Sequence, residues 1–262
     1  MPFRVSTAPT VEPLSLAELK ALLRVDHDVD DVLLSGLLTS CRQQLESILG
    51  RALVAQTVTI NRDYFPVYEI CLPRSPALSV SSITYVDSNG TTQTLSSSIY
   101  SLDTVSEPNE IVLAYGQVWP TARYQRNSVT ATYKAGYATP FTAATTDVLT
   151  FAGRAPVGGE VVRVWNSGGA LPSGLAASTD YYVINASGQT CKLSLTDGGS
   201  AVDITNTGSG LHYAGEIPRA ILTELALWVG DSYNNREGQA MPMRKITVAG
   251  EHRLWGAYDS AN

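Results

Sequence analysis

The sequence predicts an α+β protein, in which an N-terminal helical pair and one late helix pack with short antiparallel strands and carry an inserted all-β module. Three observations support this class. Helical periodicity runs from Ser15 to Arg51 and again from Pro218 to about Asn235. Apolar and polar residues alternate between residues 54 and 135, and residues 140–214 are rich in Gly, Ser and Thr without a helical stripe.

The first helix is predicted to begin at a capping box. Ser15 and Glu18 have the spacing at which a hydroxyl and a carboxylate satisfy the first backbone N–H groups reciprocally. Leu14 and Leu19 are placed for a hydrophobic staple. The expected apolar stripe contains Leu16, Leu19, Leu22 and Leu23.

An acidic corner, residues 26–31, follows the first helix. We expect Asp28 to cap the second helix and the other aspartates to favour its first turn through the helix dipole. Asp26, Asp28 and Asp30 also match the start of a calcium loop, which requires Gly at its sixth position and Glu at its twelfth. Those positions hold Asp31 and Leu37, so the sequence does not predict a metal site.

The second helix has the strongest periodic signal in the chain. Its predicted apolar face is Leu33, Leu37, Cys41, Leu45 and Leu49, widened by Leu34, Leu38 and Ile48. Its polar residues Arg42, Gln43, Gln44 and Glu46 are expected to lie off that face, and Gly50 is a natural left-handed C-cap.

Short strands are predicted after this helix. Val80–Asp87 and Thr91–Leu95 form the expected hairpin, because Asn89-Gly90 is a strong turn signal. The other expected strands of this part are Val54–Asn61, Glu69–Leu72, Tyr100–Asp103, Glu110–Tyr115 and Ser128–Ala135. Residues 1–14 are expected to be extended.

Residues 140–214 are interpreted as a separate β-module inserted into a host domain made of residues 1–139 and 215–238. Its candidate strands are Val148–Phe151, Val161–Asn166, Tyr181–Ala186, Cys191–Leu195 and Leu211–Tyr213. A tolerated insertion requires its two ends to lie close together. Residues 239–262 are interpreted as a C-terminal arm, with a strand-like segment Lys245–Val248 and a tryptophan at position 255.

Composition and motifs limit the function. A net charge of −6 disfavours a surface that binds nucleic acid by neutralising phosphates. Three cysteines without a CxxC pair predict neither a zinc site nor a disulfide framework. No apolar run reaches the roughly twenty residues that span a membrane. No signature of a phosphate loop, zinc protease, serine hydrolase or dinucleotide site occurs, so we expect no catalysis and no cofactor.

Two alternatives to a structural role were considered. Asp103, Glu107 and Glu110 are interpreted as solvated loop residues rather than a carboxylate pair for glycoside cleavage. Aromatic residues of the module are interpreted as its core rather than a sugar-binding platform; they are Trp165, Tyr181, Tyr182 and Tyr213.

The order of several short motifs carries a family resemblance. Leu19–Asp28 and a long helix ending at Gly50-Arg51-Ala52-Leu53 are followed by Leu72–Pro76, Ser79–Ile83, Tyr85–Asp87, Ala114–Gly116, Trp119-Pro120, Ala135–Tyr137 and Ile217–Ile221. In this order they resemble the head–tail connector (adaptor) proteins of tailed bacteriophages. The module separately resembles a small β-module of phage structural proteins, through Thr179–Ala186 and Lys192–Leu195.

The resemblance implies a non-enzymatic virion protein of the neck at the portal vertex, assembled in the host cytoplasm. It implies a ring homo-oligomer, usually a dodecamer, below the portal protein. Such a ring extends the DNA channel, lets genomic DNA pass without specific binding, and presents a surface to a head-closure (stopper) or tail-completion protein. No membrane is involved.

Within this family, two sets of residues are candidates for function. Asp26, Asp28, Asp30 and Asp31 are candidates for lining the channel, because an acidic lumen repels phosphate. The candidate portal-contacting arm contains Lys245, Ile246, Thr247, Val248, Arg253, Leu254 and Trp255. The inserted module is expected on the outside of the ring, with contact to a neighbouring subunit or to capsid protein as alternatives. The competing class is a phage adhesin or carbohydrate-binding structural protein that acts through residues 140–214.

Overall fold

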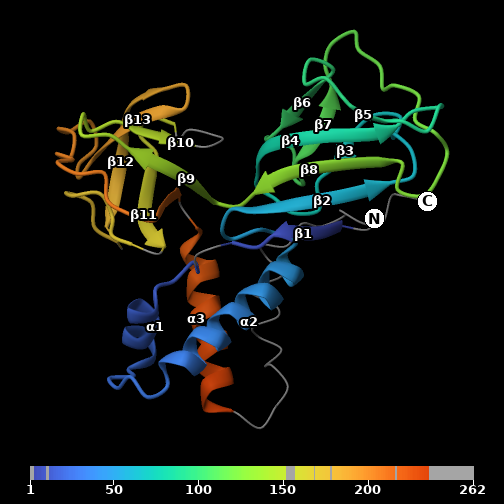
Figure 1. Ribbon diagram of the computed structural model, residues 1–262. Helices are drawn as coiled ribbons and strands as arrows, with labels where there is room; N and C mark the ends of the chain where they lie inside the picture. Colours follow the sequence, from blue (N-terminus) through green and yellow to red (C-terminus); the bar gives the residue numbers. More distant parts are fainter. Residues whose placement is uncertain are drawn as a thin grey trace.

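The computed structural model describes residues 3–9, 12–151, 157–167, 169–177, 179–215 and 217–235. This part of the chain contains a helical bundle, a pair of antiparallel sheets and a β-barrel (Figure 1). In this view the bundle lies at the bottom, the barrel at the upper left and the sheets at the upper right. The predicted α+β class with an all-β part is confirmed. No described helix is long and apolar enough to cross a membrane.

The bundle consists of α1 (Leu16–Leu23), α2 (Asp31–Leu49) and α3 (Arg219–Asn234). α3 packs against both helices of the N-terminal pair, although about 170 residues separate it from α2. Their shared core is centred on Leu19, Leu34, Leu38, Leu45, Leu225 and Trp228, each at most 2% exposed. Burial of these side chains is what holds the late helix to the early pair.

Caps fix the ends of the two early helices. The backbone N–H of Glu18 donates to Ser15 Oγ at 3.2 Å, and the Ser15 N–H donates to the Glu18 carboxylate at 3.0 Å, so the predicted capping box is confirmed. Gly50 closes α2 at φ 67°, as predicted. The predicted cap at Asp28 is wrong: Asp30 occupies the N-cap position and makes no side-chain capping bond.

The buried face of α2 differs from the predicted stripe. Its buried apolar residues are Leu34, Leu38, Cys41, Leu45 and Leu49, whereas Leu33 is 38% exposed. On α1, Leu22 is 60% exposed. An i+4 series drifts around the helix because 3.6 residues make one turn, so the position of α3 decides which part of the apolar face is covered.

Two antiparallel sheets share a second core. The larger has the order β1-β2-β8-β4-β5, from Phe3–Thr7, Gln56–Arg62, Val129–Ala135, Ala77–Val86 and Thr92–Thr94. The smaller has the order β3-β7-β6, from Ile70–Cys71, Glu110–Leu113 and Tyr100–Asp103. Val58, Ile60, Ile83, Ile111 and Tyr133 are buried between them. The predicted hairpin is β4–β5, whereas β1 was expected only to be extended.

The barrel has a third core of its own. Its strands are β9 (Ala138–Ala143), β10 (Leu149–Phe151), β11 (Val161–Ser167), β12 (Asp180–Ser187), β13 (Thr190–Ser194) and β14 (Leu211–Gly215), closed in the order β10-β13-β12-β11-β14-β9. β9 was not predicted. Ala138 pairs with Gly215, so the two connections to the rest of the chain lie side by side. That the barrel is an independently folding insertion stays a prediction.

A buried charged network joins α2 to the larger sheet. Arg42 and Glu46 were expected on the polar face, yet each is 3% exposed. Arg42 Nη1 donates to Glu46 Oε2 at 3.0 Å, and Arg42 Nε donates to Glu12 at 2.6 Å. Glu46 Oε1 accepts from the Leu53 N–H at 2.8 Å and from the Gln56 amide at 3.1 Å. The charged side chains of Arg42 and Glu46 therefore hold the turn between α2 and the larger sheet in place.

Arg74 joins the same turn to the strand region. Its Nη1 donates to the backbone carbonyls of Glu46 and Arg51 near the end of α2. The Arg74 N–H donates to the buried Tyr133 hydroxyl at 3.0 Å. Burial raises the pKa of Glu46, against the opposing effect of Arg42, so removal from water outweighs the attraction of the nearby arginine.

We predict that Glu46→Ala lowers the free energy of unfolding by about 3–5 kcal/mol, because it leaves buried donors of Arg42, Leu53 and Gln56 without their acceptor. Urea unfolding of the two proteins measures the change. Gln43→Ala, at an exposed position of the same helix, is the control and should stay within about 0.5 kcal/mol of wild type. Equal effects of the two substitutions would contradict the role of the network.

The pH dependence provides a second test, with Glu46→Gln as the reference. A raised pKa in the folded state means that the folded protein binds this proton more tightly than the unfolded chain. The resulting stability is fully present below the ordinary pKa of 4.5 and is lost as the pH rises through the raised value. Wild type should therefore gain stability relative to Glu46→Gln as the pH falls from neutral towards about 4.

Candidate functional site

The acidic corner lies between α1 and α2, and most of its carboxylates have partners. Lys20 Nζ contacts Asp28 at 2.5 Å and Asp31 at 2.8 Å. The Tyr233 hydroxyl of α3 donates to Asp30 at 2.5 Å. Hydrogen bonding to Lys20 lowers the pKa of Asp28, so this carboxylate is charged at neutral pH.

Asp26 differs from the other three aspartates. It is exposed and makes no hydrogen bond or ion pair with the described residues. Apolar side chains surround the corner: Val29 and Val32 are each 88% exposed. The corner is thus an acidic and apolar surface whose shape is set by Lys20 and Tyr233.

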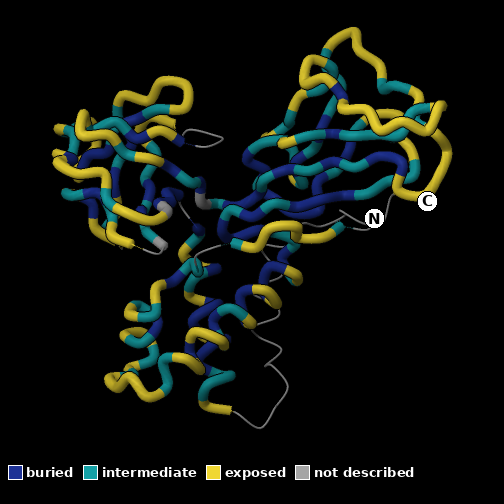
Figure 2. Tube along the Cα trace, viewed as in Figure 1, coloured by how far each residue is buried: buried dark blue, intermediate teal, exposed yellow. Residues whose placement is uncertain are grey.

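A second exposed surface joins the loop after β2 to the loop between β7 and β8. We call it the aromatic loop surface; its residues are Tyr64, Val67, Tyr68, Tyr115, Val118 and Tyr124, each at least 60% exposed. Figure 2 shows the outer loops of the sheet region as largely exposed. Clusters of large apolar residues on a surface commonly mark contacts with other molecules. In the sequence, Ala114–Gly116 and Trp119-Pro120 stand out only as motifs of the family resemblance, because the proximity of the two loops is a tertiary property.

The two loops are fixed to each other beneath this surface. The rings of Phe65 and Trp119 stack with centroids 5.1 Å apart and an interplanar angle of 8°. Trp119 Nε1 donates to the Tyr68 carbonyl at 3.2 Å, and the Asn127 N–H donates to Asp63 at 2.8 Å. The exposed tyrosines therefore extend from a braced platform, which lowers the entropic cost of binding.

The barrel has an open groove of about 520 Å³. Its lining is mostly glycine and strand residues: Gly158, Gly159, Val183, Ile184, Asn185, Asp197, Gly198, Gly199, Ser200 and Ala201. Val157 and Leu195, neighbours of this lining in sequence, are each 62% exposed. We call this lining the barrel groove.

A larger cavity, of about 570 Å³, lies where the barrel meets the bundle. Leu16, Leu38, Leu222 and Trp165 are among its lining residues. Asp180 at its edge contacts Arg163 Nε at 2.6 Å and Arg219 of α3 at 3.0 Å, and the hydrogen bond from Arg163 lowers its pKa. These contacts hold the barrel to the start of α3.

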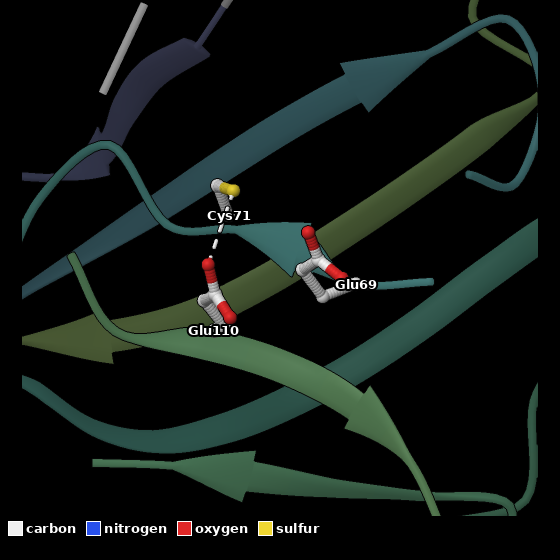
Figure 3. Close-up of side chains that lie close together, drawn as sticks. All are labelled: Glu69, Cys71 and Glu110. Carbon is white, nitrogen blue, oxygen red and sulfur yellow. Dashed lines mark hydrogen bonds between the residues drawn. The ribbon is translucent and has the colours of Figure 1, made fainter. Parts of the chain in front are cut away.

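The described residues contain one cluster with metal-ligating side chains, formed by Glu69, Cys71 and Glu110 (Figure 3). Cys71 Sγ donates to Glu110 at 3.5 Å. Burial and the neighbouring Glu110 raise the pKa of this thiol to about 11. At neutral pH this thiol is therefore protonated and donates to Glu110, and we assign no metal to the cluster.

The residues considered for catalysis have structural roles. Glu107 pairs with Arg51 at 2.7 Å, and Asp103 accepts hydrogen bonds within its own turn. Buried His212 contacts Asn166 and the Thr207 carbonyl, while His27 is exposed. Of the module aromatics, Tyr181 lies in the barrel core as expected, and Tyr213 is buried. Tyr182 is only half-buried, and Trp165 packs against the core of the bundle instead of the barrel.

One protein family matches the first part of the chain. Residues 13–105, which hold α1, α2 and the strands β2 to β6, match the family of phage gp6-like head-tail connector proteins. The family resemblance predicted from the sequence is thereby confirmed for this part of the chain. No curated protein matches the chain.

Solved structures share the fold over nearly the whole chain. A protein in the neck of an empty gene transfer agent particle, computed with C6 symmetry, has a TM-score of 0.58 at 14% identity and covers 97% of this chain and 96% of its own. One in the virion of the native particle has a TM-score of 0.57 at 15% identity, with 98% and 100% covered. One in the native neck, computed with C12 symmetry, has 0.52 at 14% identity, with 97% and 96% covered. Similarity at this identity establishes the shared fold.

The other candidate set, Lys245–Val248 with Arg253, Leu254 and Trp255, lies outside the described residues. The structure therefore places the four corner aspartates together, whereas the role of the arm stays a prediction.

Proposed function

We propose that this protein is a non-enzymatic structural subunit of the neck of a tailed phage or a phage-like particle. It forms a ring below the portal protein, extends the DNA channel and joins head to tail. The connector match over residues 13–105 carries this proposal. It is supported by a fold shared with neck proteins in structures that have twelvefold or sixfold symmetry.

The proposed partners follow from this position. Copies of the chain, twelve by analogy with the C12 neck, contact one another in the ring. The portal protein lies on one side, and a head-closure (stopper) or tail-completion protein on the other. Genomic DNA passes through without specific binding, consistent with the net charge of −6. The subunits are assembled in the host cytoplasm and reside in the virion neck.

Particles lacking this gene test the proposal directly. Electron microscopy of the lysate should show separate heads and complete tails, with DNA leaking from the heads, because the joining ring is absent. Restoring the gene should restore whole particles. Whole virions that merely fail to adsorb would contradict the proposal and favour an adhesin acting through residues 140–214.

We propose that the acidic corner faces the channel, with Asp26 and Asp28 as its exposed charges. Asp30 and Asp31 belong to the same corner, but their contacts to Tyr233 and Lys20 give them a positioning role. An acidic lumen repels the phosphate backbone and lets DNA slide.

Asp26→Lys should slow genome ejection, because each copy would place a cation against the phosphates without breaking an internal contact. Ejection kinetics from purified particles provide the measurement. Arg4→Glu, on the exposed strand β1, is a control in which the charge changes elsewhere. Unchanged ejection kinetics of the Asp26→Lys particles would contradict the proposal that the acidic corner faces the channel.

We propose that the C-terminal arm contacts the portal, with Lys245–Val248 adding a strand and Trp255 filling a pocket. Truncation after Gly238 should abolish portal binding while circular dichroism and thermal unfolding stay close to those of the full chain. Full binding by the truncated protein would show that the portal contact lies elsewhere.

A further inference from the structure

Two surfaces have no role in the functions assigned above: the aromatic loop surface and the barrel groove. They belong to opposite ends of the molecule (Figure 1), one to the outer loops of the sheet region at the right and the other to the barrel at the left. Two different surfaces at opposite ends of one chain suit a head-to-tail contact between copies.

We propose that the aromatic loop surface of one copy docks into the barrel groove of the next copy around the ring. The inference rests on the proposed ring and assigns the barrel a role in it. A head-to-tail contact of this kind closes into a ring when the rotation between neighbouring copies is a whole fraction of a full turn. The barrel is then an intersubunit clamp, instead of an outward decoration of the ring.

The loop between β7 and β8 has the chemistry of a binding hot spot. It includes Tyr115, Val118 and Tyr124, and it also holds the exposed arginines Arg123 and Arg126. Neither arginine forms an ion pair with the described residues. Tyrosine and arginine are enriched among the residues that contribute most to protein interfaces.

The barrel groove offers the complementary chemistry. Gly158, Gly159 and Gly198 leave room for an aromatic ring to approach the backbone, because the space beside each of them is open. Val157 and Leu195 supply exposed apolar surface beside it. Asp197 in the lining is exposed and has no ion pair with the described residues. It is therefore a candidate partner for Arg123 or Arg126 of the neighbouring copy.

Charge complementarity favours a second copy over nucleic acid as the occupant. A groove whose ionised lining residue is an aspartate repels phosphate. The loop supplies cations and the groove supplies an anion, so the loop of each copy is complementary in charge to the groove of the next copy around the ring.

Cysteine cross-linking tests the contact in assembled particles. Tyr124→Cys and Ser200→Cys replace exposed side chains, one on each surface. Because these positions lie at opposite ends of one copy, a short bis-maleimide should join them only between copies. Denaturing gels of treated particles should show a ladder of oligomers that each single variant lacks.

The controls separate this contact from the ring itself. Pairing Tyr124→Cys with Ser40→Cys, an exposed position on α2, should give no ladder. Rings present in normal particles without a Tyr124–Ser200 ladder would overturn the docking and leave the proposed function intact. Wild-type particles that lack the protein would contradict the proposed function, and the docking with it.

A charge exchange gives an independent readout. Arg123→Glu with Arg126→Glu should reduce incorporation of the protein into particles at least tenfold, and adding Asp197→Arg should restore much of it. Arg4→Glu should leave incorporation unchanged. Normal incorporation of the Arg123→Glu, Arg126→Glu variant would overturn the proposal. So would a loss of incorporation that Asp197→Arg does not correct, provided that the isolated variant unfolds like wild type.

Discussion

The rest of the structure depends on the buried turn at the end of α2. Glu46 accepts hydrogen bonds from Arg42, from the Leu53 backbone and from Gln56, while Arg74 donates to nearby carbonyls at the helix end. Leu53 and Gln56 lead directly into β2, a strand inside the larger sheet. The angle between helix and sheet is therefore fixed by hydrogen bonds that water cannot replace.

A rigid joint of this kind holds together parts that each have a core of their own. The bundle, the sheets and the barrel have separate cores, and α3 joins the bundle to the barrel by packing on α2 and by pairing Arg219 with Asp180. Each part can present its own exposed surface without disturbing another core.

Local signals in the sequence predicted much of the fold. The capping box at Ser15, the Gly50 cap and the β4–β5 hairpin depend on residues near one another in the chain, and they were predicted correctly. The strand β1 and the burial of Arg42 and Glu46 were missed, because each depends on a distant segment. The aromatic loop surface was also missed, since two loops separated by about fifty residues meet only in the folded chain.

The sequence by itself determined the class of fold and the family resemblance, because periodicity, capping and motif order are properties of neighbouring residues. Tertiary structure alone decided which face of α2 is buried, that Asp30 and Asp31 are held by Tyr233 and Lys20, and that the barrel closes between Ala138 and Gly215. The reason is physical: burial and pairing depend on which distant surfaces exclude water from a residue, and spacing along the chain does not specify them.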